Sequence, residues 1–236
     1  MGRQTKAERL KYRLLAVETL RAIRKTMPYS YRQLAQQTKF DETVLARYAS
    51  GATVPSYEAA KRLIESIRRS LDLRAVAGLG REDKLIDLTP LLSDPSALRL
   101  LSLEFFERFK EEEITKILVP EASGITLATA LSLLFDAPLV IARRSKENPT
   151  VEYLEEHHVE PPSARVIFYV PKSSLQRGDR VLIVDDIVQT GLTLSVMEKI
   201  VERAGAQVVG TAAIVAVGDA WRRRVRTERI VALLVL

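Results

Sequence analysis

The sequence predicts an α/β protein in two parts: an all-α bundle at the N-terminus, followed by a domain with a largely parallel sheet. Residues 1–80 show apolar side chains at helical spacing only. From residue 114 onward, short apolar runs alternate with amphipathic stretches, which is typical of strands joined by helices. Two of these runs lead into loops rich in acidic, hydroxyl and glycine residues. We therefore predict domains at residues 1–78 and 79–236.

The N-terminal domain is predicted to contain four helices. They cover residues 6–27, 31–38 and 42–49, and a fourth stretch opened by Pro55 and Ser56. Pro28 marks the end of the first helix. Ser30 and Asp41 are candidate N-caps of the two short helices, because their side-chain oxygens can accept from amides in the first turn.

The two short helices form a helix-turn-helix candidate. Leu34 and Ala35 supply a large and a small residue where the helices would cross, while Phe40, Val44 and Leu45 would fill the core. The stretch from Tyr31 to Pro55 resembles the helix-turn-helix of Cro/repressor-type regulators, which implies a DNA partner.

Six side chains are the candidate DNA contacts. Arg47, one helical turn from Thr43, can form a bidentate contact with guanine, although a surface salt bridge is the alternative. Arg32, Gln33 and Lys39 are better placed for phosphates. Tyr31 suits a phosphate contact and a core position equally well.

Charge is distributed unevenly along the chain. Residues 1–80 carry 16 Lys and Arg against 7 Asp and Glu, whereas the whole chain has a net charge of +6. The basic first third suggests a polyanionic partner, and a solvated helical surface is the alternative. The absence of cysteine excludes disulfides, thiolate metal sites and a cysteine nucleophile. We expect a cytoplasmic protein with no membrane span and no dedicated metal site.

The second domain follows a linker at residues 70–84. In chain order we predict a helix at 98–109, a strand at 114–119, a helix ending at 135, strands at 138–142, 166–170 and 181–184, a helix at 194–201, and strands at 211–217 and 230–236. Ligands of such sheets bind beyond the carboxyl ends of the strands.

The most informative motif begins at Val181. An apolar strand ends in Asp185 and Asp186, and a loop with hydroxyl and glycine residues then leads into a helix. Paired carboxylates can accept hydrogen bonds from two ribose hydroxyls, while loop amides and a helix N-terminus hold phosphate. This motif resembles the signature of type I phosphoribosyltransferases, whose ligand is phosphoribosyl pyrophosphate (PRPP). The resemblance implies that fold and PRPP contacts by Asp185, Asp186, Gln189, Thr190, Gly191, Leu192 and Thr193.

A second loop extends the resemblance. Glu121, Ala122, Ser123 and Gly124 precede a helix and resemble the pyrophosphate loop of purine-type phosphoribosyltransferases, especially the xanthine-specific branch. Arg143, Arg144 and Lys146 follow the next strand, as does the basic segment that meets the pyrophosphate in that family. The resemblance also implies Mg2+, bound through PRPP, and a homodimer. No residue is assigned a catalytic role.

Three functions fit these features. We favour a DNA-binding transcription regulator that senses PRPP or a related nucleotide, serving nucleotide metabolism genes. The basic excess lies on the helix-turn-helix, and only a short tail follows the strand at 211–217 to complete a base pocket. Its plan resembles that of archaeal regulators with an orotate phosphoribosyltransferase-like domain and of the bacterial purine-operon repressor family. The alternatives are an active purine or pyrimidine phosphoribosyltransferase with a helical accessory domain, and a non-catalytic sugar-phosphate binder with a helical interaction module.

Overall fold

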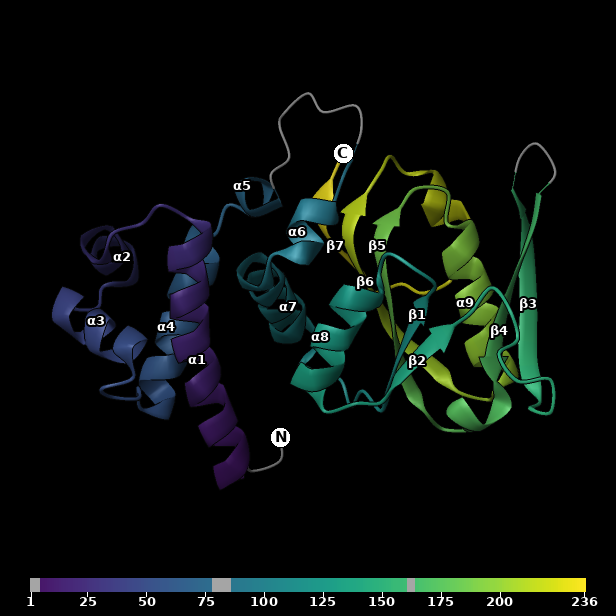
Figure 1. Cartoon of the computed structure of the whole chain (residues 1–236), viewed down its shortest axis with the longest axis horizontal. Coiled ribbons are helices and arrows are strands. Elements are labelled where there is room, and N and C mark those ends of the chain that lie inside the picture. Colours follow the sequence, from purple (N-terminus) through teal and green to yellow (C-terminus); the bar gives the residue numbers. More distant parts are fainter. Residues whose placement is uncertain (1–4, 78–85, 161–163) are drawn as a thin grey trace. The chain divides into compact units, whose positions relative to one another are not determined.

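The computed structural model describes residues 5–77, 86–160 and 164–236 (Figure 1). The chain forms two compact units, residues 1–104 and 105–236. The domain boundary predicted after residue 78, and part of the linker predicted at 70–84, lie outside the described residues. No helix in the described ranges is long and apolar enough to cross a membrane.

The first unit is helical. Its elements are α1 (Lys6–Thr26), α2 (Tyr31–Thr38), α3 (Glu42–Ser50), α4 (Tyr57–Ser70), α5 (Leu73–Ala77) and α6 (Thr89–Ser93), and α7 (Pro95–Phe109) begins here and ends in the second unit. The capping side chains of Ser30, Asp41 and Ser56 accept from amides in the first turns of α2, α3 and α4. The predicted helices are confirmed. They form because strong local caps and a buried apolar stripe act together.

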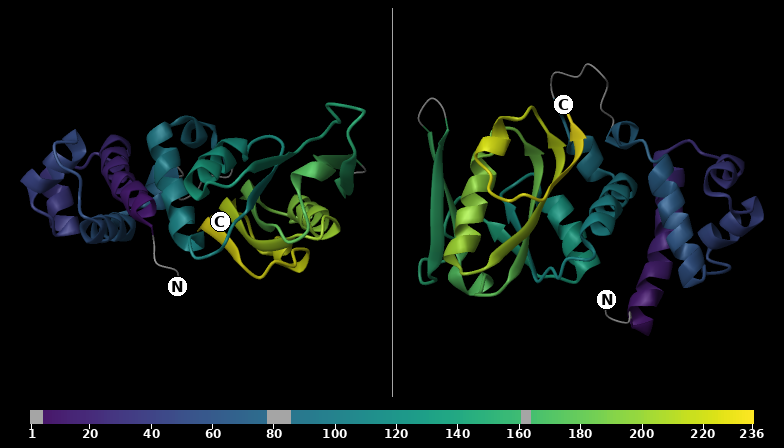
Figure 2. Two further views of the ribbon diagram at one scale, coloured as in Figure 1. Left: turned by 90° about the horizontal axis from the view of Figure 1, so that it is seen from below. Right: turned by 180° about the vertical axis from the view of Figure 1, so that it is seen from behind.

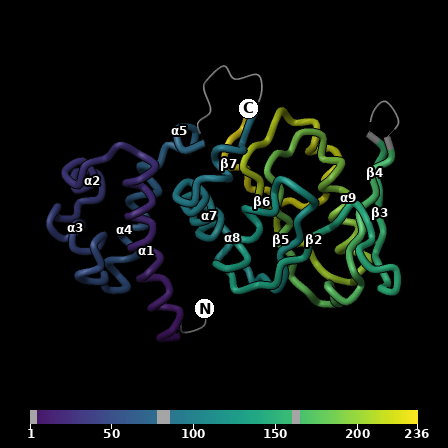
Figure 3. The backbone as a smooth tube through the Cα atoms, in the orientation of Figure 1, coloured from purple at the N-terminus to yellow at the C-terminus, as the bar shows by residue number. Residues whose placement is uncertain are grey.

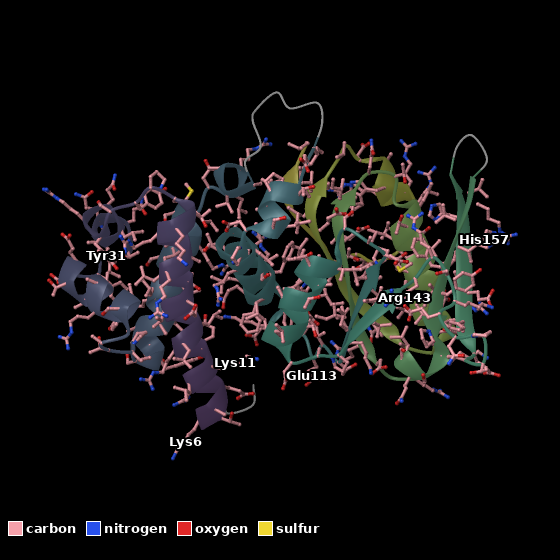
Figure 4. The ribbon with its side chains drawn as sticks, in the orientation of Figure 1. Lys6, Lys11, Tyr31, Glu113, Arg143 and His157 are labelled. Carbon is pink, nitrogen blue, oxygen red and sulfur yellow. The ribbon has the colours of Figure 1, made fainter. Side chains whose placement is uncertain are left out.

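Three of the six residues predicted to touch DNA have local roles in this unit. The Arg24 guanidinium lies 3.8 Å from the ring centre of Tyr31, at the start of α2 (Figure 4). Oε1 of Gln33 accepts from the Ser30 amide at 2.8 Å and completes a capping box. Lys39 ends α2 in the left-handed conformation, with φ of 60°. Arg32, Thr43 and Arg47 are exposed.

The second unit is built on a five-stranded sheet of order β2-β1-β5-β6-β7, and all neighbouring pairs are parallel. The strands are β1 (Lys116–Pro120), β2 (Leu139–Ala142), β5 (Arg180–Val188), β6 (Gln207–Ala216) and β7 (Ile230–Val235). Helix α8 (Ile125–Phe135) packs on β1, β2 and β5, and α9 (Leu192–Arg203) packs on β1, β5 and β6 (Figure 2). The predicted α/β class with a parallel sheet is confirmed.

A separate antiparallel hairpin, β3 (Tyr153–Glu160) with β4 (Ala164–Pro171), lies against α9 (Figure 3). The sequence predicted a strand at residues 166–170, within β4, but none at the position of β3. A hairpin packed on one face only can carry charged side chains on the other, so β3 lacks the apolar run of a buried strand. Leu154, Val166, Phe168 and Val170 of the hairpin join the core of the unit.

Candidate active site

The acidic pair lies inside strand β5, whereas the sequence predicted that the pair ends the strand. Asp185 pairs with Ala213 of β6, and pairing continues to Val188. The Asp185 side chain is buried, at 8% exposure, and Asp186 is partly buried. Burial, followed by the neighbouring Asp186 carboxylate, raises the pKa of Asp185 well above its ordinary value of 3.8. The pair is therefore a desolvated acceptor site near the carboxyl end of the central strand.

A tight turn connects β5 to α9. Gly191 adopts φ of 75°, a conformation that glycine reaches without strain, and the Ser195 amide donates to its carbonyl oxygen. Leu192 is the first residue of α9, and its amide donates to Oγ1 of Thr190 at 3.3 Å. Gln189 and Thr190 are exposed. The N-cap residue Gly191 supplies no side-chain acceptor, so the amides that follow Leu192 in the first turn of α9 are available to an anion.

The loop after β1 lies beside this acidic pair. Gly124 starts α8, and a Cβ atom added to it would lie 3.3 Å from Cα of Asp185 and 3.4 Å from the Asp186 amide nitrogen. The close approach of the two backbones thus leaves little room for a side chain at residue 124. Ala122 and Ser123 are exposed, and the peptide bond between Glu121 and Ala122 is cis. The two loops predicted from the sequence therefore meet at one edge of the sheet.

The basic segment after β2 is tied to the first loop. The Arg144 amide donates to Oε2 of Glu121 at 2.9 Å, and Nη1 of Arg143 lies 3.8 Å from Oε1 of the same carboxylate. Arg143, at the end of β2 (Figure 4), also pairs with Glu147 at 2.9 Å. The Arg144 guanidinium lies 5.4 Å from the ring centre of Phe168. Arg143 and Arg144 thus flank the loop at residues 121–124.

Lys146, predicted to join them, is instead engaged by the hairpin. Its Nζ forms an ion pair with Glu155 and lies 5.2 Å from the ring centre of Tyr169. The hydrogen bond to Glu155 raises the pKa of Lys146. This lysine therefore remains cationic at neutral pH, with a carboxylate already beside it.

Residues 96–232 match the model of the phosphoribosyl transferase domain family. The chain belongs to this family. It is 35% identical over 149 residues to adenine phosphoribosyltransferase 1 of Triticum aestivum, covering 63% of this chain and 81% of the wheat protein. It is 33% identical over 165 residues to the adenine phosphoribosyltransferase of Cupriavidus taiwanensis, covering 65% and 86%.

A solved structure agrees with these relatives. The crystal structure of adenine phosphoribosyltransferase from Rhodothermus marinus is similar, with a TM-score of 0.60 and 32% identity, and the match covers 66% of this chain and 88% of that chain. The phosphoribosyltransferase fold predicted from the motif is therefore confirmed.

These relatives overturn the predicted regulator. They are enzymes, so the lean towards a non-enzyme is wrong, and so is the assignment as a DNA-binding transcription regulator. The residues withdrawn as DNA contacts are Tyr31, Arg32, Gln33, Lys39, Thr43 and Arg47. Within the first unit Gln33 completes a capping box and Lys39 ends α2. The homodimer expected from the sequence stays a prediction.

The sequence did not predict how the C-terminal segment of this chain supports the turn after β5. Trp221, in a short 3-10 helix at Ala220–Arg223, is buried beside Gly191, and Nη1 of Arg224 donates to the Thr190 carbonyl oxygen at 3.1 Å. The cluster of arginines at 222–229 was visible in the sequence, but no local spacing relates residue 224 to residue 190, so this contact had no sequence signal.

Proposed function

We propose that this protein is an active phosphoribosyltransferase that transfers the 5-phosphoribosyl group of PRPP to adenine. The observation that carries this proposal is the meeting of two glycine-dependent loops at the carboxyl edge of the sheet, one with a buried carboxylate pair and one flanked by arginines. Adenine is proposed as the base because the relatives of this chain include adenine phosphoribosyltransferases. In this reading residues 1–78 are a helical accessory domain, and residues 79–236 form the transferase domain.

Each end of PRPP matches one loop. The turn after β5 and the first amides of α9 suit the 5-phosphate, because they offer donors and the positive end of a helix. The carboxylates of Asp185 and Asp186 suit the ribose hydroxyls. The loop after β1 and the arginines beside it suit the pyrophosphate. The proposed PRPP-binding residues are Glu121, Ala122, Ser123, Gly124, Arg143, Arg144, Lys146, Asp185, Asp186, Gln189, Thr190, Gly191, Leu192 and Thr193.

The transfer exchanges one bond at the ribose C1 for another. The C1–O bond to pyrophosphate breaks, a base nitrogen forms the new C1–N bond, and the proton of that nitrogen is lost. Positive charge develops on the sugar as pyrophosphate leaves. The carboxylates of Asp185 and Asp186, bound to the ribose hydroxyls, would therefore stabilise the transition state. The arginines flanking the first loop would stabilise the leaving pyrophosphate.

Mg2+ belongs to this proposal as the partner of the pyrophosphate. Among the described residues no three His, Cys, Asp or Glu side chains gather into a group that could hold a metal ion. Mg2+ commonly retains water and binds substrate phosphates, so water and the oxygens of PRPP can coordinate the ion without a dedicated protein site. The ion would offset the charge of the leaving pyrophosphate.

The test is nucleotide formation by the purified full chain. We would incubate it with PRPP and Mg2+ and, in parallel, adenine, hypoxanthine, guanine, xanthine, orotate or uracil, and identify the products by chromatography. We expect adenosine monophosphate and pyrophosphate in equal amounts. Another nucleotide would correct the base but keep the reaction, whereas no product with any base would refute the enzyme.

A chain beginning at residue 79 tests the domain assignment. If the first 78 residues are accessory, this shorter chain should fold and retain the transferase reaction. A shorter chain that folds but has lost the reaction would show that the helical domain contributes to the active site.

A further inference from the structure

The Thr190–Gly191 peptide is held from the side of the C-terminal segment. Nη1 of Arg224 donates to the Thr190 carbonyl oxygen at 3.1 Å. Because a trans peptide is planar, its carbonyl and its N–H point in opposite directions. The contact with Arg224 therefore directs the Gly191 N–H away from the C-terminal segment.

The Gly191 amide has the properties of a ligand donor. Gly191 is buried, and within the described ranges its N–H donates to no protein acceptor. A buried amide without an acceptor is costly, so such groups usually serve a ligand or water. The amide precedes the first turn of α9, where the helix dipole favours an anion.

The Arg224 side chain is carried by a firmly anchored segment. On one side Trp221 is buried, and its indole N–H donates to the Gly218 carbonyl oxygen at 3.0 Å. On the other, the buried Glu198 carboxylate of α9 accepts from the Arg226 amide and from the amide and hydroxyl of Thr227. Arg224 lies between these anchors, so its position is fixed relative to the start of α9.

The arginines near Arg224 in the sequence lie in different surroundings. The Arg222 guanidinium lies 4.4 Å from the ring centre of Trp221, and Arg226 pairs with Glu202 at 3.1 Å. Arg223 is exposed in the same 3-10 helix. Among the described residues of this segment, Arg224 is the arginine whose side chain bonds to the turn after β5.

We propose that Arg224 is a positioning residue for the 5-phosphate of PRPP, acting through the Thr190–Gly191 peptide so that the Gly191 amide donates to the phosphate. This inference rests on the proposed function, because it assigns the phosphate to the turn after β5. A charge-assisted bond to the carbonyl prevents the peptide from rotating and thereby preorganises the donor. The effect of Arg224 is confined to ligands that carry the 5-phosphate.

The test compares Arg224→Ala, Arg224→Lys and the matched control Arg223→Ala in the full chain. Calorimetry would measure the affinities for ribose 5-phosphate and for inorganic pyrophosphate separately, and kinetics would give KM for PRPP and kcat. For Arg224→Ala we expect about tenfold weaker ribose 5-phosphate binding and a similar rise in KM for PRPP, as for loss of one charge-assisted hydrogen bond. Pyrophosphate affinity should not change, and kcat should fall less than KM rises.

The lysine variant and the control distinguish positioning from general stability. Lysine can still donate to the carbonyl, so Arg224→Lys should recover part of the lost affinity and provides the test if the alanine variant does not fold. Arg223→Ala should bind like the wild type. Unchanged ribose 5-phosphate binding in Arg224→Ala, or an equal loss for pyrophosphate, would overturn the inference and leave the proposed function intact. A wild type that binds neither ribose 5-phosphate nor PRPP would refute both.

Discussion

The two candidate anion loops are held in place by different means. The loop after β1 is held by a side chain, because the Glu121 carboxylate accepts from the Arg144 amide and lies near the Arg143 guanidinium. The turn after β5 is held mainly by shape, through the positive φ of Gly191 and the close packing of Trp221, with one side-chain contact from Arg224 to the Thr190 carbonyl oxygen. The first arrangement depends on charge, whereas the second depends mostly on shape and on the single contact from Arg224. Changes of charge and changes of volume should therefore affect the loops differently.

The largest effect is expected from the carboxylate pair that precedes the turn after β5. The double variant Asp185→Asn, Asp186→Asn should weaken PRPP binding by about a hundredfold or more, because both ribose hydroxyls lose charged acceptors. Calorimetry with PRPP and Mg2+ measures this, and circular dichroism checks the fold. Unchanged affinity in a folded variant would remove the ribose role.

Gly191→Ala tests the claim that shape controls the turn. The new Cβ would lie 2.9 Å from the Trp221 carbonyl oxygen in a backbone with φ of 75°. We expect Tm to fall by about 4 °C or more and PRPP affinity to fall about tenfold. Gly178→Ala is the matched control, since φ is 89° there and nothing lies within 4 Å. Equal losses in both variants would assign the effect to backbone strain alone.

Glu121→Gln should have a smaller effect of the opposite sign. The amide oxygen can still accept from the Arg144 amide, but the negative charge beside Arg143 is removed. Inorganic pyrophosphate should bind about threefold more tightly, and less so at high salt. Titrations at two ionic strengths measure this. Weaker binding would indicate that Glu121 itself contacts the ligand.

The smallest effect concerns the pH dependence of stability. Because the pKa of Asp185 is raised in the folded chain, the folded state retains this proton where the unfolded state has lost it. The Asp185 carboxyl therefore lowers the free energy of unfolding as pH rises from 3.8, its ordinary pKa, through the raised pKa. Asp185→Asn should raise Tm by about 2 °C at pH 7 relative to its effect at pH 4. A variant equally affected at both pH values would show that Asp185 is ionised without cost.

How far the sequence predicts this protein depends on the range of the interactions. Ser30 and Asp41 cap helices through amides two or three residues away, so their roles were visible as local patterns. The extension of β5 through Asp185 depends on pairing with β6, and charged residues in a strand hide that pairing. The contact of Arg224 with Thr190 spans 34 residues of sequence. The site was therefore predicted where its motifs are contiguous and missed where the fold completes them.

The functional error has a physical cause as well. Positive charge in the N-terminal helices was interpreted as attraction to a polyanion, but several of these cations are paired with carboxylates one helical turn away. Arg21 pairs with Glu18, Lys61 with Glu58, and Arg69 with Glu65. An excess of basic residues remains after such pairing, and a net charge does not show whether the cations form one binding surface.

The central claim is that the two loops hold PRPP for transfer to adenine. The most direct test is the initial rate of adenine-dependent pyrophosphate release by the full chain with PRPP and Mg2+, beside the double variant Asp185→Asn, Asp186→Asn. We expect release that requires adenine and is lost in the folded double variant. Release that is absent in the wild type, or equal in the variant, would contradict it.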